Sequence, residues 1–235
     1  MQVIPVIDVM NTVVVYATGG ERARYRPIET PLSRSADPVE VVDGLLTLHP
    51  FEILYVADLD GIAGHQPNEA ALDRLRRAFP KLSIWVDDGS SSIAAIASRS
   101  QCGFTPVVGS ETLPDARALD AIRTNAHDQW LLSLDFKGST FLGPIQVARE
   151  PARWPQTVIC MTLAAVGAKS GPELERVKSL SLLSPSSRIV AAGGVRDKAD
   201  LMALSQAGAW GVLAATALHT GTLKAGDLDE IAGLR

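Results

Sequence analysis

Short runs of apolar, often β-branched residues alternate along the chain with segments whose apolar positions recur at helical spacing. Such runs are typical of strands buried on both faces, and their alternation with helices indicates parallel βαβ units. The predicted strands are Val3–Asp8, Ile53–Asp58, Ser83–Asp87, Thr105–Gly109, Trp130–Asp135, Thr157–Thr162, Arg188–Ala192 and Trp210–Ala214. The predicted helices are Pro38–Leu48, Asn68–Phe79, Ser91–Gln101, Pro114–Ala126, Pro172–Leu183, Arg196–Gln206 and Asp227–Leu234.

The order of these elements predicts an α/β fold, a (β/α)8 TIM barrel that forms one domain over residues 1–235. An open doubly wound sheet is the alternative, and the lack of a GxGxxG fingerprint makes it the weaker one. An internal repeat favours the barrel, because the segments that begin at Asp88 and Gly193 align without a gap, 105 residues apart. This repeat is interpreted as a half-barrel duplication, with chance similarity between two βαβ units as the alternative.

Composition and charge limit the classes of partner that this chain is expected to bind. The net charge of −4 supplies no surplus of cations for the phosphates of nucleic acid. Cys102 and Cys160 belong to no CxxC or Cys/His cluster, so neither a disulfide framework nor a structural zinc site is expected. Asp8 interrupts the apolar N-terminal run, so no signal peptide is expected there. No apolar stretch reaches the roughly 18 residues that a membrane span needs. We therefore expect a soluble, cytoplasmic protein without a membrane or nucleic-acid partner.

Carboxylates cluster at the predicted strand ends, where the catalytic loops of a barrel lie. Asp8 and Asp135 end the first and fifth strands, which face each other across an eight-stranded barrel. Two facing carboxylates can serve as general base and general acid when their environments separate their pKa values. Asp58, after the second strand, is a candidate for substrate binding. The alternative for each single Asp is that it caps the following loop or helix.

A candidate phosphate site follows the last two strands. Gly193 and Gly194 allow backbone N–H groups to approach an anion, and the start of the following helix adds its dipole. Ala215 and Thr216 offer small residues at the next strand-to-helix turn, as in the phosphate sites that barrels build there. The alternative is a tight βα turn without a ligand.

The position equivalent by the repeat carries charge instead. Asp87 and Asp88 precede Gly89, and the next turn brings Ser110 and Glu111. Two unit negative charges about 4 Å apart repel by roughly 4 kcal/mol at an effective dielectric near 20, about a thousandfold in affinity. We therefore expect one phosphate, beside Gly194, and a neutral or cationic substrate group toward Asp87, Asp88, Gly89 and Ser110. The alternative is that Asp87 and Asp88 turn outward. No spacing motif calls for a metal or a cofactor.

Arginines alternate in the loop after the first strand, at Arg22, Arg24 and Arg26. Guanidinium groups bind carboxylate or phosphate in a bidentate manner, so this loop is a candidate clamp for an anionic substrate. The alternative is a solvated basic loop.

Four segments, IPVIDVMN, LYVADLDGIAG, SLDFKG and AAGGVRDKADLMALSQAGAWGVLAATALHTG, together resemble the histidine-biosynthesis barrel family. That family contains ProFAR isomerase and the cyclase subunit of imidazole glycerol phosphate synthase. The resemblance covers nearly the whole chain. It implies a catalytic pair at Asp8 and Asp135, assistance from Thr162, and a phosphate site at Gly194, Ala215 and Thr216.

The chain also departs from the family pattern. Asn11-Thr12 stands in place of the usual D-G, Asp87-Asp88-Gly89 in place of GGG, and the D-G-T after the sixth strand is missing. The arginine loop resembles a divergent branch that accompanies tetrahydromethanopterin and methanofuran one-carbon metabolism. The expected function is an isomerase- or lyase-like enzyme, with Asp8 as base and Asp135 as acid, acting on a small phosphorylated metabolite. The alternatives are ProFAR isomerase itself and a non-catalytic binder of a one-carbon cofactor precursor or of a partner protein.

Overall fold

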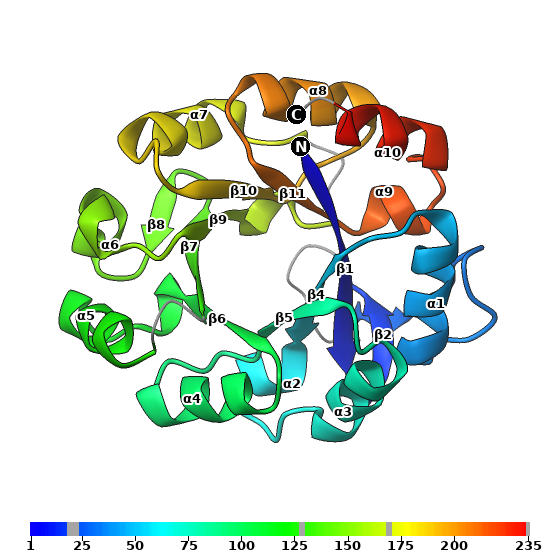
Figure 1. Ribbon diagram of the computed structural model, residues 1–235, viewed down its shortest axis with the longest axis horizontal. Coiled ribbons are helices and arrows are strands. Elements are labelled where there is room, and N and C mark those ends of the chain that lie inside the picture. The colour runs from blue at the N-terminus through cyan, green and yellow to red at the C-terminus, as the bar shows by residue number, and fades with distance from the viewer. Residues whose placement is uncertain (18–23, 127–129, 168–170, 234–235) are drawn as a thin grey trace.

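A closed ring of parallel strands forms the centre of the molecule (Figure 1), so the predicted (β/α)8 barrel is confirmed. The computed structural model describes residues 1–17, 24–126, 130–167 and 171–233. The barrel strands, in their order around the ring, are β1 (Gln2–Met10), β4 (Ile53–Asp58), β5 (Ser83–Asp87), β6 (Thr105–Gly109), β7 (Leu131–Lys137), β9 (Thr157–Thr162), β10 (Arg188–Ala192) and β11 (Gly211–Ala214). The ring closes where β11 pairs with β1, with Gln2 beside Gly211. An open sheet is thereby excluded.

Helices surround the ring on its outside (Figure 1). They are α1 (Pro38–Leu48), α2 (Leu59–Ile62), α3 (Glu69–Ala78), α4 (Ile93–Gln101), α5 (Ala116–Asn125), α6 (Ile145–Arg149), α7 (Leu174–Leu183), α8 (Lys198–Gln206), α9 (Thr216–His219) and α10 (Ala225–Ala232). Side-chain caps fix several of the starts: Asp37, Asp115 and Asp197 accept backbone N–H groups of α1, α5 and α8. Among the described residues, no helix is long and apolar enough to cross a membrane.

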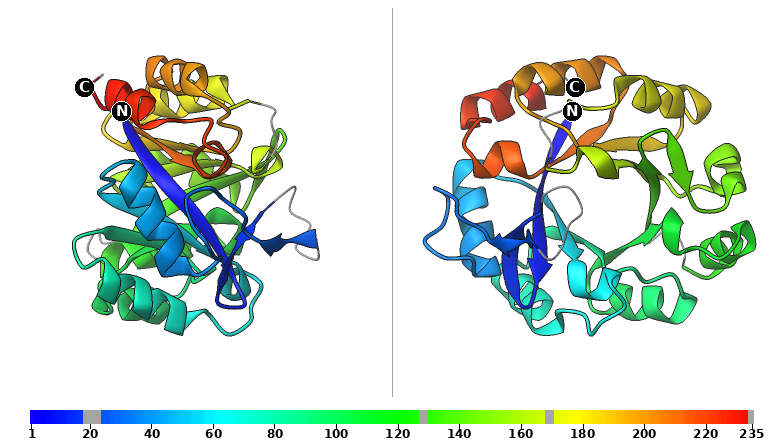
Figure 2. Two further views of the ribbon diagram at one scale, coloured as in Figure 1. Left: turned by 90° about the vertical axis from the view of Figure 1, so that its right-hand side faces the viewer. Right: turned by 180° about the vertical axis from the view of Figure 1, so that it is seen from behind.

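Three short strands were not predicted. β2 (Val13–Tyr16) and β3 (Arg26–Pro27) continue antiparallel from β1, and β8 (Thr140–Leu142) folds back on β7. In the side view of Figure 2, β2 and β3 project from one rim of the barrel. Asn11 and Thr12 turn the chain between β1 and β2 with φ values of 50° and 66°. These additions extend the rim of the barrel where β1 and β7 end.

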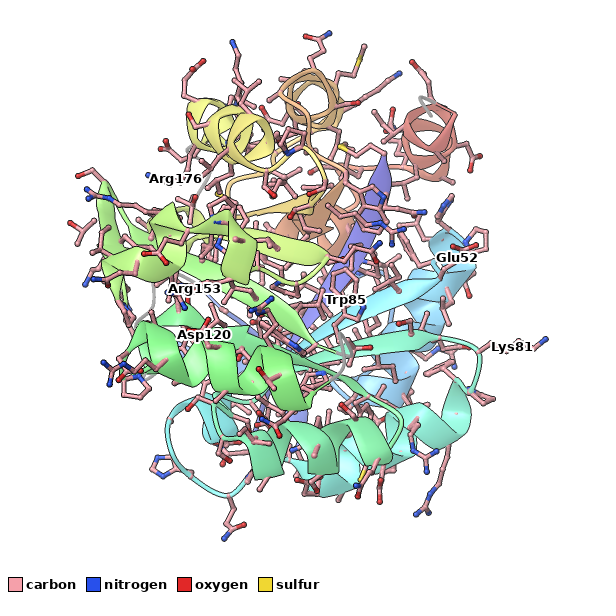
Figure 3. The ribbon with its side chains drawn as sticks, turned by 60° about the vertical axis from the view of Figure 1, so that its left-hand side comes forward. Glu52, Lys81, Trp85, Asp120, Arg153 and Arg176 are labelled. Carbon is pink, nitrogen blue, oxygen red and sulfur yellow. The ribbon has the colours of Figure 1, made fainter. Side chains whose placement is uncertain are left out.

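The core has two layers, because successive side chains of a strand point to opposite faces. The inner cluster fills the barrel and contains Ile4, Tyr55, Trp85, Leu131 and Ile159. The outer cluster lies between strands and helices and includes their sequence neighbours, such as Val158 and Cys160 on β9. Figure 3 labels Trp85, a member of the inner cluster, and Arg153 and Asp120, which form an ion pair with each other. Strand parity therefore decides which polar residues reach the barrel interior.

The two repeat segments adopt the same local structure at the offset of 105 residues. α4 spans Ile93–Gln101 and α8 spans Lys198–Gln206, the same length in the same place. Gly89 and its counterpart Gly194 both have positive φ, 73° and 85°. This agreement supports the duplication, which stays a proposal.

Candidate active site

A cavity of about 910 Å³ opens at the rim of the barrel that carries the carboxyl ends of the strands. Every barrel strand, or the turn after it, contributes to its wall. Enzymes of this fold place their chemistry at this rim, and a cavity of this size accommodates a small metabolite. The cavity is therefore the candidate active site.

Three aspartates point into the cavity because each lies an even number of residues along its strand from a side chain buried inside the barrel. Asp87 stands two residues after Trp85, and Asp135 stands four residues after Leu131, both members of the inner cluster. Asp8 has the same relation to Ile4 on β1. β1 and β7 are four strands apart in a ring of eight, so Asp8 and Asp135 reach the cavity from opposite walls.

The Asp8 carboxyl has no hydrogen-bond donor among the described residues and is half-buried in the cavity wall. Burial raises the pKa of Asp8 from 3.8 to about 7, because desolvation disfavours the charged form. Both protonation states of Asp8 are therefore populated near neutral pH.

Asp135 is held by a network of buried donors. The Ser133 hydroxyl donates to Oδ1 at 2.6 Å, and the Glu111 N–H donates to Oδ2 at 3.3 Å. The Ser110 Oγ lies 3.2 Å from Oδ2, accepts the Asp135 N–H at 2.9 Å, and donates to the Leu142 carbonyl at 2.7 Å. Burial raises the pKa of Asp135 to about 7, with the Ser133 hydrogen bond acting in the opposite direction. Ser110 does not line the cavity, so its predicted contact with substrate is replaced by a contact with Asp135.

Asp87 forms a third carboxylate at the cavity. The Tyr55 hydroxyl donates to Oδ2 of Asp87 at 2.9 Å, and the Gly89 N–H donates to Oδ1 at 3.2 Å. Burial raises the pKa of Asp87 to about 6, although the Tyr55 hydrogen bond lowers it. Burial first, and then the charges of Asp87, Asp135 and Asp8, raise the pKa of Tyr55 well above 10. Tyr55 therefore stays a hydrogen-bond donor among three carboxylates.

The opposite wall is built from small residues. Gly193 and Gly194 have φ values of 98° and 85°, and a Cβ atom on Gly194 would lie 2.2 Å from the Gly171 carbonyl oxygen. Ala215 and Thr216 line the same wall. α8 begins at Lys198 rather than directly after the glycines, whereas the short helix α9 begins at Thr216. Backbone groups are thus exposed to the cavity where a phosphate site was predicted.

Asp58 and Asp88 do not line the cavity, so their predicted role as substrate ligands needs correction. Each stands one position after the last inward-facing residue of its strand. Asp58 accepts hydrogen bonds from the Gly61 N–H at 3.2 Å and the Asn68 N–H at 2.7 Å, which makes it a helix cap. Asp88 forms a buried ion pair with Arg99, 2.6 Å from Nη2 to Oδ2. The expected repulsion of a second phosphate therefore rests on Asp87 and not on Asp88.

Thr162 also lies off the cavity, and Met161 lines it in its place. The Thr162 hydroxyl accepts a hydrogen bond from Arg176 Nη1 at 3.1 Å. The Arg176 guanidinium stacks 4.3 Å from the centre of the Phe136 ring and is labelled in Figure 3. The structure therefore places Thr162 in a contact between β9 and α7 rather than beside a substrate.

Of the three arginines, Arg22 lies outside the described residues. Arg24 and Arg26 are exposed and do not line the cavity. Tyr25, between them, is buried and lines it. Arg24 and Arg26 therefore form no clamp over the cavity in this structure.

Sequence reasoning missed Tyr55, Lys137 and Arg196, all of which line the cavity, whereas Glu111, which the sequence had placed near Asp87, lines it as well. Strand alternation could have found Lys137, which stands two residues after Asp135. Arg196 binds Asp200 in an ion pair at 2.7 Å, so part of its charge is already compensated. Among the described residues, Lys137 and Arg196 are the basic side chains, lysine or arginine, that line the cavity.

Comparisons with known proteins find sequence relatives over nearly the whole chain. The sequence model of the family described as "Histidine biosynthesis protein" matches residues 2–224. The chain is 28% identical over 245 residues to the 1-(5-phosphoribosyl)-5-((5-phosphoribosylamino)methylideneamino) imidazole-4-carboxamide isomerase (ProFAR isomerase) of Listeria innocua, covering 98% of each chain. The chain is 25% identical over 247 residues to the isomerase of the same name from Lacticaseibacillus casei, covering 99% of this chain and 100% of the relative. An uncharacterized protein of Methanocaldococcus jannaschii is 27% identical over 234 residues, covering 98% of this chain and 97% of the relative.

Proposed function

The chain belongs to the histidine biosynthesis protein family, and from this premise we propose that it is an isomerase-like enzyme. Its substrate would be a small phosphorylated metabolite, and its chemistry would be acid–base catalysis by Asp8 and Asp135. The observation that carries the proposal is the pair of facing carboxyl groups whose pKa values burial raises to about 7. A catalytic acid or base works best when its pKa lies near the working pH.

An aldose–ketose rearrangement of the Amadori type fits two such groups. The acid protonates the ring oxygen or the imine nitrogen, and the base removes a proton from the neighbouring carbon. This gives an enaminol; C1 then gains a proton while the C2 hydroxyl loses one, which yields the aminoketose isomer, so the protons balance and the reaction needs no oxidant or reductant. We assign the base to Asp8, whose carboxyl is not held by described donors, and the acid to Asp135.

Binding would use one phosphate. The backbone at Gly193, Gly194, Ala215 and Thr216 offers N–H groups without bulky side chains, which favours an anion. Toward Asp87 and Glu111 the wall is acidic, which disfavours a second phosphate and suits a neutral or cationic group. A substrate with a phosphate at each end, such as ProFAR, would then bind poorly.

Two metabolic pathways are candidates for the origin of the substrate. The resemblance of the arginine loop supports one-carbon cofactor metabolism involving tetrahydromethanopterin or methanofuran. The 28% identity to a ProFAR isomerase supports histidine biosynthesis. The missing GGG and D-G-T motifs favour the first.

The decisive experiment assays the purified protein, Asp8→Asn and Asp135→Asn with ProFAR and with a phosphoribosylamine that carries one phosphate. We expect the unchanged protein to isomerise the monophosphate and not ProFAR. Both variants should isomerise the monophosphate at least about a hundredfold more slowly. Asp43→Asn, an exposed carboxylate on α1, is the matched control and should keep full activity.

Full activity in either catalytic variant would contradict the acid–base pair. Turnover of ProFAR would contradict the single phosphate and support the histidine pathway. If both phosphorylated probes raise the melting temperature but neither is converted, the protein is a binder, which is the remaining alternative.

A further inference from the structure

A second, much smaller cavity of about 10 Å³ lies behind Asp8, between β1, β2 and α9. It adjoins the large cavity, and Val6, Asp8, Ala17, Ala215 and Thr216 contribute to the walls of both. The polar side chains that line the small cavity are Asp8, Tyr16, Thr216 and His219.

His219 carries an unsatisfied acceptor in this region. The imidazole Nε2 lies 3.3 Å from the Val6 carbonyl oxygen, which can only accept, so Nε2 holds the proton. Nδ1 is then an acceptor, and it has no partner among the described residues, although His219 is only 4% exposed. Leaving such an atom unpaired is unfavourable, so a donor is required there.

The small cavity suits a single water molecule. Its volume is about that of one water-sized probe, and a buried water needs two to four polar partners, roughly the number that line it. The Tyr16 hydroxyl already donates to the Thr216 Oγ1 at 3.4 Å. Of the acceptors on the residues that line the cavity, His219 Nδ1 and the Asp8 carboxylate have no donor among the described residues.

We propose that one water molecule in this cavity donates one hydrogen to His219 Nδ1 and the other to Asp8, so that His219 is a positioning residue for Asp8. The inference rests on the proposed function, in which Asp8 is the base. When Asp8 becomes protonated, its hydroxyl donates to the water oxygen while the water still donates to Nδ1. The link thus survives both protonation states of Asp8, provided that His219 stays neutral.

The groups around His219 keep it neutral. Burial lowers the pKa of His219, and the hydrogen bond to the Val6 carbonyl opposes this only in part. The titratable groups that face the small cavity are Asp8 on β1, Tyr16 on β2 and His219 itself on α9. Because burial keeps the His219 ring neutral, the charge on Asp8 is the one that changes near neutral pH.

The test is an NMR titration of the full chain labelled with ¹⁵N in histidine and ¹³C in the aspartate carboxyl groups. We expect His219 to be in the neutral Nε2–H form at neutral pH, because burial lowers its pKa. In His219→Phe, which removes the acceptor, the pKa of Asp8 should rise by about half to one unit, because the water's hydrogen bond to the charged carboxylate is stronger than the one it accepts from the neutral acid. His219→Asn, whose amide oxygen can accept, should restore most of the original pKa, and His49→Phe should leave it unchanged.

An Nδ1–H tautomer, or an Asp8 pKa that is the same in all four proteins, would overturn the inference. If His219→Phe does not fold, the tautomer of the unchanged protein and a crystal structure decide, since electron density for a water between Nδ1 and Asp8 is required. Neither readout involves turnover. A failure here therefore leaves the acid–base pair standing, and a failure of the pair leaves the water link measurable.

Discussion

Replacing Ser133 by Ala tests how the protein adjusts the acidity of Asp135. The substitution removes one hydroxyl and leaves the volume nearly unchanged. That hydroxyl donates to Oδ1 of Asp135 at 2.6 Å, while Glu111 N–H and Ser110 serve Oδ2. Ser133 is completely buried, so water does not take its place. The carboxylate loses a donor that favours its ionised form.

The expected shift follows from the strength of such a bond. A hydrogen bond to a charged group contributes about 1.5–3 kcal/mol, and one pKa unit corresponds to about 1.4 kcal/mol. The pKa of Asp135 should therefore rise from about 7 by roughly one to two units. If Asp135 is the acid, the alkaline limb of the rate profile moves up with it. If it is the base, the acidic limb moves instead, which exchanges the roles of Asp8 and Asp135.

The assay is a ¹³C-carboxyl NMR titration of Asp135 in the unchanged protein and in the variant. Ser110→Ala is an internal comparison: its hydroxyl lies farther from the carboxylate, at 3.2 Å, and its one hydrogen is donated to the Leu142 carbonyl, so its removal should shift the pKa less. Ser179→Ala, on the surface of α7, should shift nothing. An Asp135 pKa that falls or stays constant in Ser133→Ala would refute this account of the site.

Two further predictions concern stability. Burial lifts the pKa of Asp135 above its unfolded value of 3.8, so the native state retains a proton and the free energy of unfolding falls as pH rises from about 4 to about 7. Urea unfolding should therefore show Asp135→Asn more stable than the unchanged protein at about pH 8, by up to about 4 kcal/mol, and equal at about pH 4, whereas the exposed Asp43→Asn should match the unchanged protein at both. Gly194→Ala places a Cβ atom 2.2 Å from the Gly171 carbonyl oxygen at a φ of 85°, and the same assay should show a loss of more than about 2 kcal/mol. Gly226→Ala in α10 meets nothing within 4 Å and should be neutral or stabilising; an equal loss in both glycine variants would exclude the clash as the cause.

The barrel strands were predictable because strands buried on both faces read as apolar runs. β4 and β9 have the predicted bounds, Ile53–Asp58 and Thr157–Thr162. β2 was missed because the turn before it contains no glycine, although Asn11 and Thr12 both have positive φ. Contacts distant in sequence hold this turn: the Asn11 N–H donates to Asp60 at 2.7 Å and the Thr12 N–H to Asn68 at 2.7 Å. The sequence around the turn does not predict these distant hydrogen-bond acceptors.

The site was predicted in part for a similar reason. Asp8, Asp87 and Asp135 end strands at inward positions and line the cavity, as a count of alternate residues allows. Asp88 and Thr162 stand one position away and point elsewhere, which the same count would have shown. That Asp88 pairs with Arg99 could not be predicted, because the arginine comes from the helix after the strand and its orientation depends on packing.

The pairing of β1 with β11 has a consequence for how the chain folds during synthesis. β1 lies near the N-terminus, and its partner Gly211–Ala214 emerges about 200 residues later. At about 5–20 residues per second, one edge of β1 waits on the order of ten seconds or more for its neighbour. The edge that waits is the stretch from Gln2 to Pro5, while β2 pairs with the other end of the strand within a few residues of synthesis. The nascent chain thus protects the Asp8 end of β1 early and leaves its beginning open to incorrect pairing until the last barrel strand arrives.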